Sequence, residues 1–184
     1  MKNISEAKDY QKGNFDMKTN NVTTEDGAGV MLYSLSGTTR SSAKEAREAK
    51  DYVAKAKKEG ILSFSDEVTV DNLKKSGMSE SEAYRYGTAY EINQAAKQQV
   101  QREDVMEGFG SNGGEELISY LLTGESIMLQ GGNEWRSWYE TMHKRIIAIQ
   151  KNDGSWEGHH CITSPVFCTA AALLILSISN DMEE

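Results

Sequence analysis

The last third of the chain, residues 134–178, constrains the fold most. The run Ala170–Leu176 is apolar almost all round the helix that it predicts, and this helix begins at Pro165 with Ser164 as its N-cap. A helix without a polar face has to be enclosed by other parts of the protein. At about 13 residues it is also too short to cross a bilayer, which needs roughly 20 apolar residues. We therefore expect a packed all-α body and no membrane span.

A second helix is expected just before it, over residues 134–150. Trp138, Met142, Arg145 and Ile149 recur at steps of three and four residues, which is typical of an amphipathic helix. A turn joins the two helices and contains a recognisable group of five residues: Gln150, Asp153, Gly154, Ser155 and Trp156.

This turn resembles the Q…DGSW repeat of the squalene cyclase and protein prenyltransferase superfamily, whose helices form an α/α toroid. The likeness covers about the last 70 residues and includes the segment 119–132, SYLLTGESIMLQGG. The resemblance implies that the Gln150 amide ties adjacent helix ends together, with the Trp156 ring packed beside it. A neutral amide can satisfy both exposed N–H and exposed carbonyl groups. We therefore interpret the five motif residues as structural and not catalytic.

The composition indicates one acidic, helical domain. The chain has 184 residues and a single proline, Pro165, so little interrupts its helices. Its 20 Lys and Arg against 28 Asp and Glu give a net charge of −8, which argues against nucleic acid or an anionic membrane as a partner. The first residues lack the apolar run of a signal peptide. As written the protein is expected to be cytoplasmic, or periplasmic or secreted if a signal sequence was removed.

We divide the chain into a polar segment, 1–20, and a helical domain, 21–184. The polar segment is expected to hold a short helix anchored by Tyr10 and Phe15. In the domain, the first expected helix covers 23–36, with Thr23 or Thr24 as cap and Gly37 as its end, and the second covers 41–59 and is ended by Gly60. Further helices are expected over 68–76 and 114–130. Between these two, a capping box of Ser79 and Glu82 opens a long helix. The pair 22–36 and 41–59 resembles the pair 114–130 and 134–150. This period predicts αα-hairpin repeats that form a partial α/α toroid.

One loop carries most of the metal-binding side chains. His159, His160, Cys161 and Cys168 supply the four imidazole and thiolate donors that a tetrahedral zinc site uses. Neither a C-x-x-C nor an H-x3-H spacing is present, so the main interpretation is a loop with reduced thiols whose imidazoles cap helix ends. The zinc set of the prenyltransferases, a D-x-C pair with a distant His, is not matched either. We predict no cofactor and keep zinc as the alternative.

A second group of residues is a candidate pocket. It consists of Tyr86, Tyr90, Glu115, Glu116, Tyr120 and His143, in which carboxylates and an imidazole could meet across facing helices as an acid/base pair. Glu115 and Glu116 follow the glycine-rich loop 108–114, with Asn112 or Gly114 as helix cap. Acidic residues in a first helical turn are usually there because the helix dipole stabilises their charge.

Two functions remain open. The first is a non-catalytic module that binds a protein partner, or an apolar small molecule, on the concave face of the toroid, with a partner or a second copy completing the ring. The second is an isoprenoid-processing enzyme with an atypical active site. The only string comparable to the acidic motif of the cyclases, residues 65–71, lacks its DxDD pattern, which favours the first.

Overall fold

The protein is all-α apart from one short strand pair. The computed structural model describes residues 2–24, 30–108, 113–130 and 134–178. The elements in chain order are α1 (Lys2–Gly13), β1 (Phe15–Asp16), β2 (Asn21–Val22), α2 (Met31–Lys58), α3 (Val70–Lys75), α4 (Glu80–Val100), α5 (Glu103–Met106), α6 (Gly114–Gln130), α7 (Glu134–Ala148) and α8 (Pro165–Ser177). The prediction of an all-α class is confirmed. Among the described residues, no helix is both long enough and apolar enough to cross a membrane.

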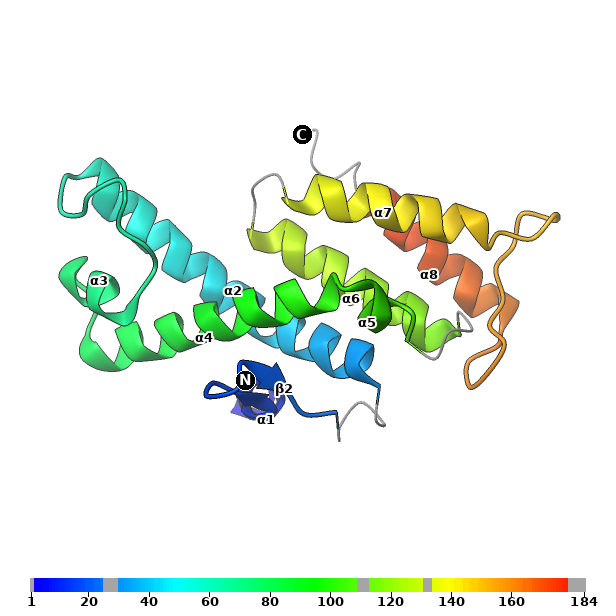
Figure 1. The fold of residues 1–184 in the computed structure, drawn as a ribbon, viewed down its shortest axis with the longest axis horizontal. Coiled ribbons are helices and arrows are strands. Elements are labelled where there is room, and N and C mark those ends of the chain that lie inside the picture. The colour runs from blue at the N-terminus through cyan, green and yellow to red at the C-terminus, as the bar shows by residue number, and fades with distance from the viewer. Residues whose placement is uncertain (1, 25–29, 109–112, 131–133, 179–184) are drawn as a thin grey trace.

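Helix α2 is the element on which the others pack. Its main partners are α4 and α6, while α6 also packs against α7 and α8. Figure 1 shows α2 and α4 running together from α3, at one end of the molecule, to the group of α6, α7 and α8 at the other. The larger hydrophobic core lies among α2, α4, α6, α7 and α8, and Phe15 of the strand pair joins it. A smaller core lies near α3 and contains Ala49, Val53, Ala56, Leu62, Leu73, Met78 and Ala83.

The predicted helix break at Gly37 is wrong, because α2 continues through it as one helix of 28 residues. The hydroxyl groups of Thr39 and Ser42 donate back to carbonyls four residues earlier, so these side chains satisfy themselves within the helix. Gly37 also serves a contact, since a Cβ there would lie 3.1 Å from the Gln11 side-chain nitrogen. The first of the two expected αα-hairpins, 22–36 with 41–59, therefore does not exist.

The start of this helix also differs from the prediction. Thr23 and Thr24 lie outside α2, whose N-cap is Val30 in an extended conformation. The expected first-turn acids, Glu25 and Asp26, fall outside the described residues. In the N-terminal segment, Phe15 is buried as expected, whereas Tyr10 is 67% exposed.

Small polar residues line the seam between α2 and its partners. Ser36 Oγ lies 3.1 Å from Thr123 Oγ1 of α6, in hydrogen-bond contact. The Asn93 amide of α4 donates to the Thr39 carbonyl at 2.9 Å and accepts a hydrogen bond from Gln130 of α6. Because these buried side chains satisfy one another, three helices can approach closely without stranding polar groups.

Helix α8 is less enclosed than the sequence suggests. Cys168, Ala171, Ala172 and Ile175 are buried. Its opposite face remains open, with Val166 82%, Leu173 55% and Leu174 54% exposed. The expectation that this helix is covered on all sides is therefore wrong. α8 lies at the edge of the bundle, and the described residues cover only one of its faces.

Candidate functional site

Glycines bring two distant loops into contact at the start of α6. The Gly114 amide donates to the Ile162 carbonyl at 3.0 Å. A Cβ on Gly158 would collide with that same carbonyl and would lie 3.1 Å from the Cα of Gly113. Side chains at these positions would push the backbones apart. The loop that carries the His and Cys residues is thereby seated on the N-terminus of α6.

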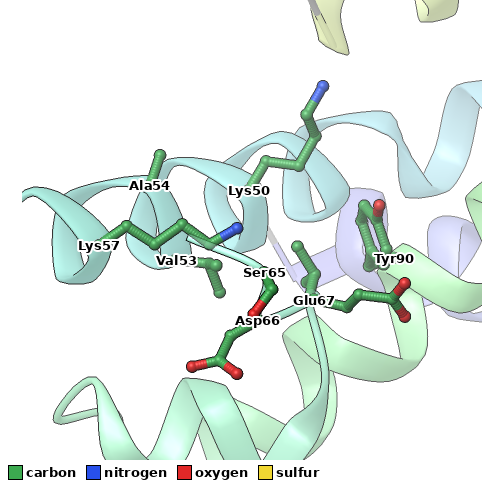
Figure 2. A pocket seen from close by; sticks show the side chains of 9 residues that line it. Lys50, Val53, Ala54, Lys57, Ser65, Asp66, Glu67 and Tyr90 are labelled. Carbon is green, nitrogen blue, oxygen red and sulfur yellow. The ribbon is translucent and has the colours of Figure 1, made fainter. Parts of the chain in front are cut away.

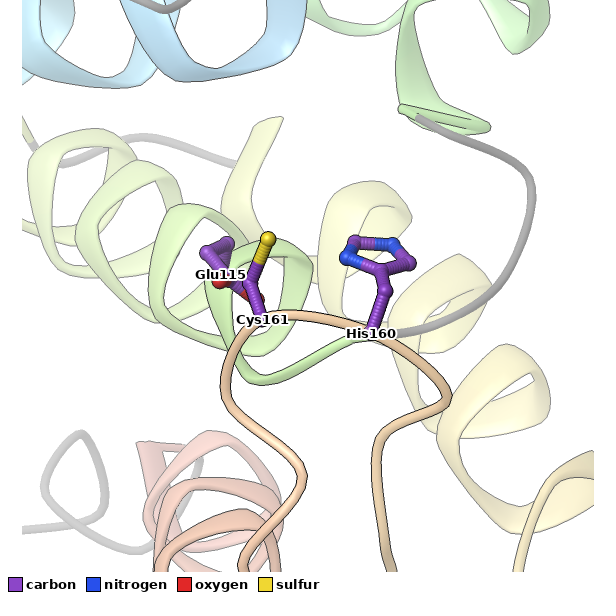
Figure 3. Close-up of side chains that lie close together, drawn as sticks. All are labelled: Glu115, His160 and Cys161. Carbon is purple, nitrogen blue, oxygen red and sulfur yellow. The ribbon is translucent and has the colours of Figure 1, made fainter.

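This contact assembles three different metal-binding side chains. One donor atom each from Glu115, His160 and Cys161 lies within 4.8 Å of the others, and we name these residues the Glu–His–Cys cluster. Figure 3 shows His160 and Cys161 on one loop, with Glu115 reaching them from α6. Cys161 has a φ of 43°, a left-handed conformation that is uncommon for a residue with a side chain. The loop therefore holds the thiol in a constrained position.

The two carboxylates beside the cluster are held at different depths. Glu115 is partly buried and its Oε1 accepts a hydrogen bond from the Ile162 amide at 3.1 Å. Its Oε2 is buried and accepts no hydrogen bond from an N–H or O–H group of the described residues. Glu116 is fully buried, with Oε1 3.5 Å from His160 Nε2. Both carboxylates lie in the first turn of α6, where the helix dipole favours negative charge.

Neighbouring groups respond to this negative charge. Burial raises the pKa of the Tyr33 phenol, and the charge and hydrogen bond of Glu116 raise it further. The pKa of Cys161 is raised, first by its hydrogen bond to Glu115 and then by burial and the charges of both carboxylates. Burial also raises the pKa of Cys168. Because thiolates are the nucleophilic form of cysteine, neither thiol is activated for nucleophilic catalysis by the groups around it.

The structure separates the four residues that the sequence grouped as a metal set. Both cysteines are free thiols. Cys168 is buried in α8 with its Sγ 3.7 Å from the Ile162 carbonyl, and His159 is exposed. In the described part of the chain, the group of donors close enough to share one ion takes Glu115 in their place.

The motif residues of the α7–α8 turn make specific contacts. Trp156 is 2% exposed, and its Nε1 donates to the Ile146 carbonyl in the last turn of α7 at 2.8 Å. Its backbone amide donates to Thr169 Oγ1 of α8 at 3.1 Å. The Gln150 amide donates to the Gly154 carbonyl at 2.9 Å, within the turn itself. Trp156 thus links the two helices, its indole bonding to α7 and its backbone amide to α8, while the Gln150 contact is local.

Asp153 shapes the same turn. Its Oδ1 accepts hydrogen bonds from the Ser155 amide at 3.0 Å and from the Ser155 hydroxyl at 2.7 Å. Both hydrogen bonds lower the pKa of Asp153. Gly154 has a φ of 86°, which favours glycine at this position.

The other residues of the expected pocket are not brought together. Tyr120 is buried, and its hydroxyl donates to the Met106 carbonyl at 2.6 Å. His143 is exposed on α7, with its ring centroid 5.9 Å from that of Tyr139. Tyr86 lies under the Arg85 guanidinium, 4.7 Å from the ring centroid. These positions do not support the predicted acid/base pair between His143 and Glu115 or Glu116.

Tyr90 lines a separate pocket of about 510 Å³ between α2, α4 and the loop before α3. Figure 2 shows its lining, which is Lys50, Val53, Ala54, Lys57, Ser65, Asp66, Glu67, Val68 and Tyr90. The two lysines are already engaged, because Lys57 Nζ donates to the Phe64 carbonyl at 3.0 Å and Lys50 Nζ to the Gln130 carbonyl at 2.8 Å. The pocket is of mixed charge, and its walls favour neither an apolar ligand nor an anion.

The pairing of Glu115 with His160 and Cys161 was missed in the sequence. The signal that marks it is the set of glycines on both sides, Gly113 and Gly114 before the acid and Gly158 before the histidines. Comparison of the chain with protein-family models, with curated proteins and with solved structures gives no match.

Proposed function

We propose that the chain is a non-catalytic helical interaction module, part of an α/α-toroid-like arrangement, that associates with a second copy of itself through the outer face of α8. The observation that carries this proposal is the exposed stripe of Val166, Ala170, Leu173 and Leu174. Spacings of four, seven and eight residues place these side chains on one side of the helix. We name them the α8 stripe.

The charge pattern favours a second copy as the occupant. Residues 165–177 contain no charged side chain, whereas every other helix that the structure describes carries acidic residues. Two copies of the α8 stripe can therefore meet across a two-fold axis without like-charge repulsion, despite the net charge of −8.

The toroid-like arrangement is supported by the packing of the last three helices. α6 packs against both α7 and α8, and the Trp156 indole bonds to the end of α7. In such an arrangement each helix pair covers an apolar face of the next, so an end pair is left with an uncovered face. The α8 stripe has the position and composition of that face.

The size of the stripe predicts a weak dimer. Burying a whole Val or Leu side chain contributes about 1.5–3 kcal/mol, so covering the exposed parts of the stripe contributes roughly 4 kcal/mol per copy. Association itself costs about 4–15 kcal/mol. The two copies together gain about 8 kcal/mol, so even the smallest association cost leaves a dissociation constant in the millimolar range.

Sedimentation velocity over this concentration range tests the proposal. We expect the wild-type chain to shift from monomer to dimer and the Leu173→Glu variant to remain monomeric. Ile147→Glu is the matched control, because Ile147 is 44% exposed on α7 and receives the same charge. A wild-type chain that stays monomeric at every concentration, or equal losses in both variants, would contradict the second-copy proposal.

The second function, an isoprenoid-processing enzyme, draws less support. A diphosphate group needs free cationic partners. The lysines of the 510 Å³ pocket donate to backbone carbonyls, and Asp66 and Glu67 share its wall. Thermal stabilisation of the protein by a prenyl diphosphate would reverse this preference.

A further inference from the structure

The geometry at the start of α6 points to a zinc site: we propose that Glu115, His160 and Cys161 bind one Zn²⁺ ion. The ligand atoms are a carboxylate oxygen, an imidazole nitrogen and the thiolate sulfur, which lie within 4.8 Å of one another. This proposal does not depend on association through α8, because none of the three ligands belongs to the α8 stripe and Glu115 comes from α6 (Figure 3).

The donor set selects the metal. Zinc takes thiolate, imidazole and carboxylate ligands, whereas Mg²⁺ and Ca²⁺ require oxygen. Three protein ligands leave the fourth tetrahedral position to water or to an added ligand. Glu115 and the Cys161 thiolate carry two negative charges, which balance those of the ion. Binding transfers the Cys161 thiol proton to solvent as the sulfur–zinc bond forms.

Gly113 packs against the same group of side chains. The position that a Cβ on Gly113 would occupy lies 2.8 Å from Glu115 Oε2, 2.8 Å from His160 Cε1 and 2.9 Å from Glu116 Oε2. The missing side chain of Gly113 therefore lets the Glu115 and Glu116 carboxylates and the His160 ring lie closer to this backbone than any larger residue would allow.

Glu116 acts as a positioning residue for the imidazole. Its Oε1 lies 3.5 Å from His160 Nε2, and Glu116 itself is fully buried. A carboxylate on one ring nitrogen orients the ring and leaves the other nitrogen, here Nδ1, for the metal. Figure 3 shows the imidazole turned toward the Cys161 sulfur. This arrangement is the usual carboxylate–histidine–metal order.

The side chains need to close only slightly around an ion. Zinc–ligand bonds of about 2.0–2.3 Å set the distances between ligand atoms at roughly 3.3–3.8 Å. The three ligand atoms now lie within 4.8 Å of one another, so they have to move about 1 Å closer together. Cys161 is exposed and His160 has 26% of its side chain exposed, so both can rotate by that amount without disturbing the core.

Metal titration of the full chain, stripped beforehand with a chelator, tests the proposal. Co²⁺ is the probe because it takes zinc's ligands and gives a thiolate-to-cobalt absorption band. We expect one equivalent of Co²⁺ to produce this band and Zn²⁺ to abolish it by displacement. Competition with a chromophoric chelator then gives the affinity for Zn²⁺, and circular dichroism checks that each variant is folded.

Matched variants assign the ligands. Cys161→Ser should lose the band and Cys168→Ala should keep it, so the two thiols are distinguished. His160→Gln should weaken Zn²⁺ binding at least about tenfold, while its neighbour His159→Gln should leave it unchanged. Absence of the band at saturating Co²⁺, or a band that follows Cys168, would overturn the proposal. Equal weakening by both histidine variants would overturn it as well.

Two further variants separate ligand from support. Glu116→Gln should keep the cobalt band but weaken Zn²⁺ binding by about 10- to 100-fold, as loss of an orienting partner does. Gly113→Ala should also weaken binding, because its methyl group would push the Glu115, Glu116 and His160 side chains away from their present positions. If Gly113→Ala binds Zn²⁺ as tightly as the wild-type chain, the ion is not held by the side chains in these positions.

Discussion

Replacing Trp156 by phenylalanine is the sharpest test of how α7 and α8 are held together. The indole is 2% exposed, and its Nε1 donates to the Ile146 carbonyl at 2.8 Å. Phenylalanine keeps an aromatic ring in the same place but lacks the N–H group and fills less space. The substitution therefore removes the link to the end of α7 without introducing a new polar group.

The expected loss of stability has two parts. A buried hydrogen bond contributes about 1 kcal/mol. The smaller ring leaves unfilled space and loses buried surface, which together cost about 1–2 kcal/mol. The free energy of unfolding should thus fall by about 2–3 kcal/mol. For a chain of this size each kcal/mol shifts the melting temperature by about 2–4 °C, so a decrease of roughly 4–12 °C is expected.

Urea unfolding followed by circular dichroism measures this difference. Trp135→Phe is the control, because it makes the same chemical change on α7 at a residue that is only partly buried. We expect the control to lose less than about 1 kcal/mol. If Trp156→Phe unfolds within about 0.5 kcal/mol of the wild-type chain, or if both variants lose the same amount, the buried indole and its hydrogen bond to α7 do not stabilise the fold as argued.

Two other substitutions address the core. Gly124→Ala would place a methyl group against the Trp138 ring, closer than atoms normally approach, so we expect a loss of about 1–3 kcal/mol. A methyl group on Gly13 would have no heavy atom within 4 Å, so Gly13→Ala should not destabilise the fold. Equal stability of the two variants in urea would contradict this. Burial raises the pKa of Tyr120 from 10.0 to about 12 while its hydroxyl donates to the Met106 carbonyl. The unfolded chain therefore ionises first, and stability that is present below pH 10 should be lost between about pH 10 and 12, by roughly 2–3 kcal/mol. Urea unfolding at several alkaline pH values should show a smaller loss for Tyr120→Phe, and identical slopes would argue against this assignment.

The parts of the fold that the sequence predicted correctly are those decided by neighbouring residues. The capping box of Ser79 and Glu82 is present at the start of α4. Ser164 caps α8, with Pro165 at its first position. Gly60 follows the end of α2 with a φ of 75°. In each case the deciding contacts lie within a few residues, so the amino-acid order alone specifies them.

The break predicted at Gly37 failed because its environment is tertiary. Glycine costs a helix about 1 kcal/mol relative to alanine, which is small against the burial that α2 gains along its length. Leu32, Leu35 and Ala43 are fully buried on either side of it. Contacts with α4 and α6, which no local pattern contains, therefore keep the helix intact through Gly37.

The candidate site was predicted only in part for a similar reason. His160 and Cys161 were recognised by their chemistry, but Glu115 lies 45 residues earlier and was assigned to a pocket with His143. The two segments meet through the hydrogen bond from Gly114 to Ile162. Only the folded chain shows that pairing, and it replaces His159 and Cys168 with a carboxylate.

The arrangement of the Glu–His–Cys cluster thus depends on residues that contribute no donor atoms. Gly113, Gly114 and Gly158 set the separation of two backbones, and at each of them even a methyl group would meet a neighbour closer than atoms normally approach. The geometry of the cluster therefore depends largely on positions at which the polypeptide has no side chain.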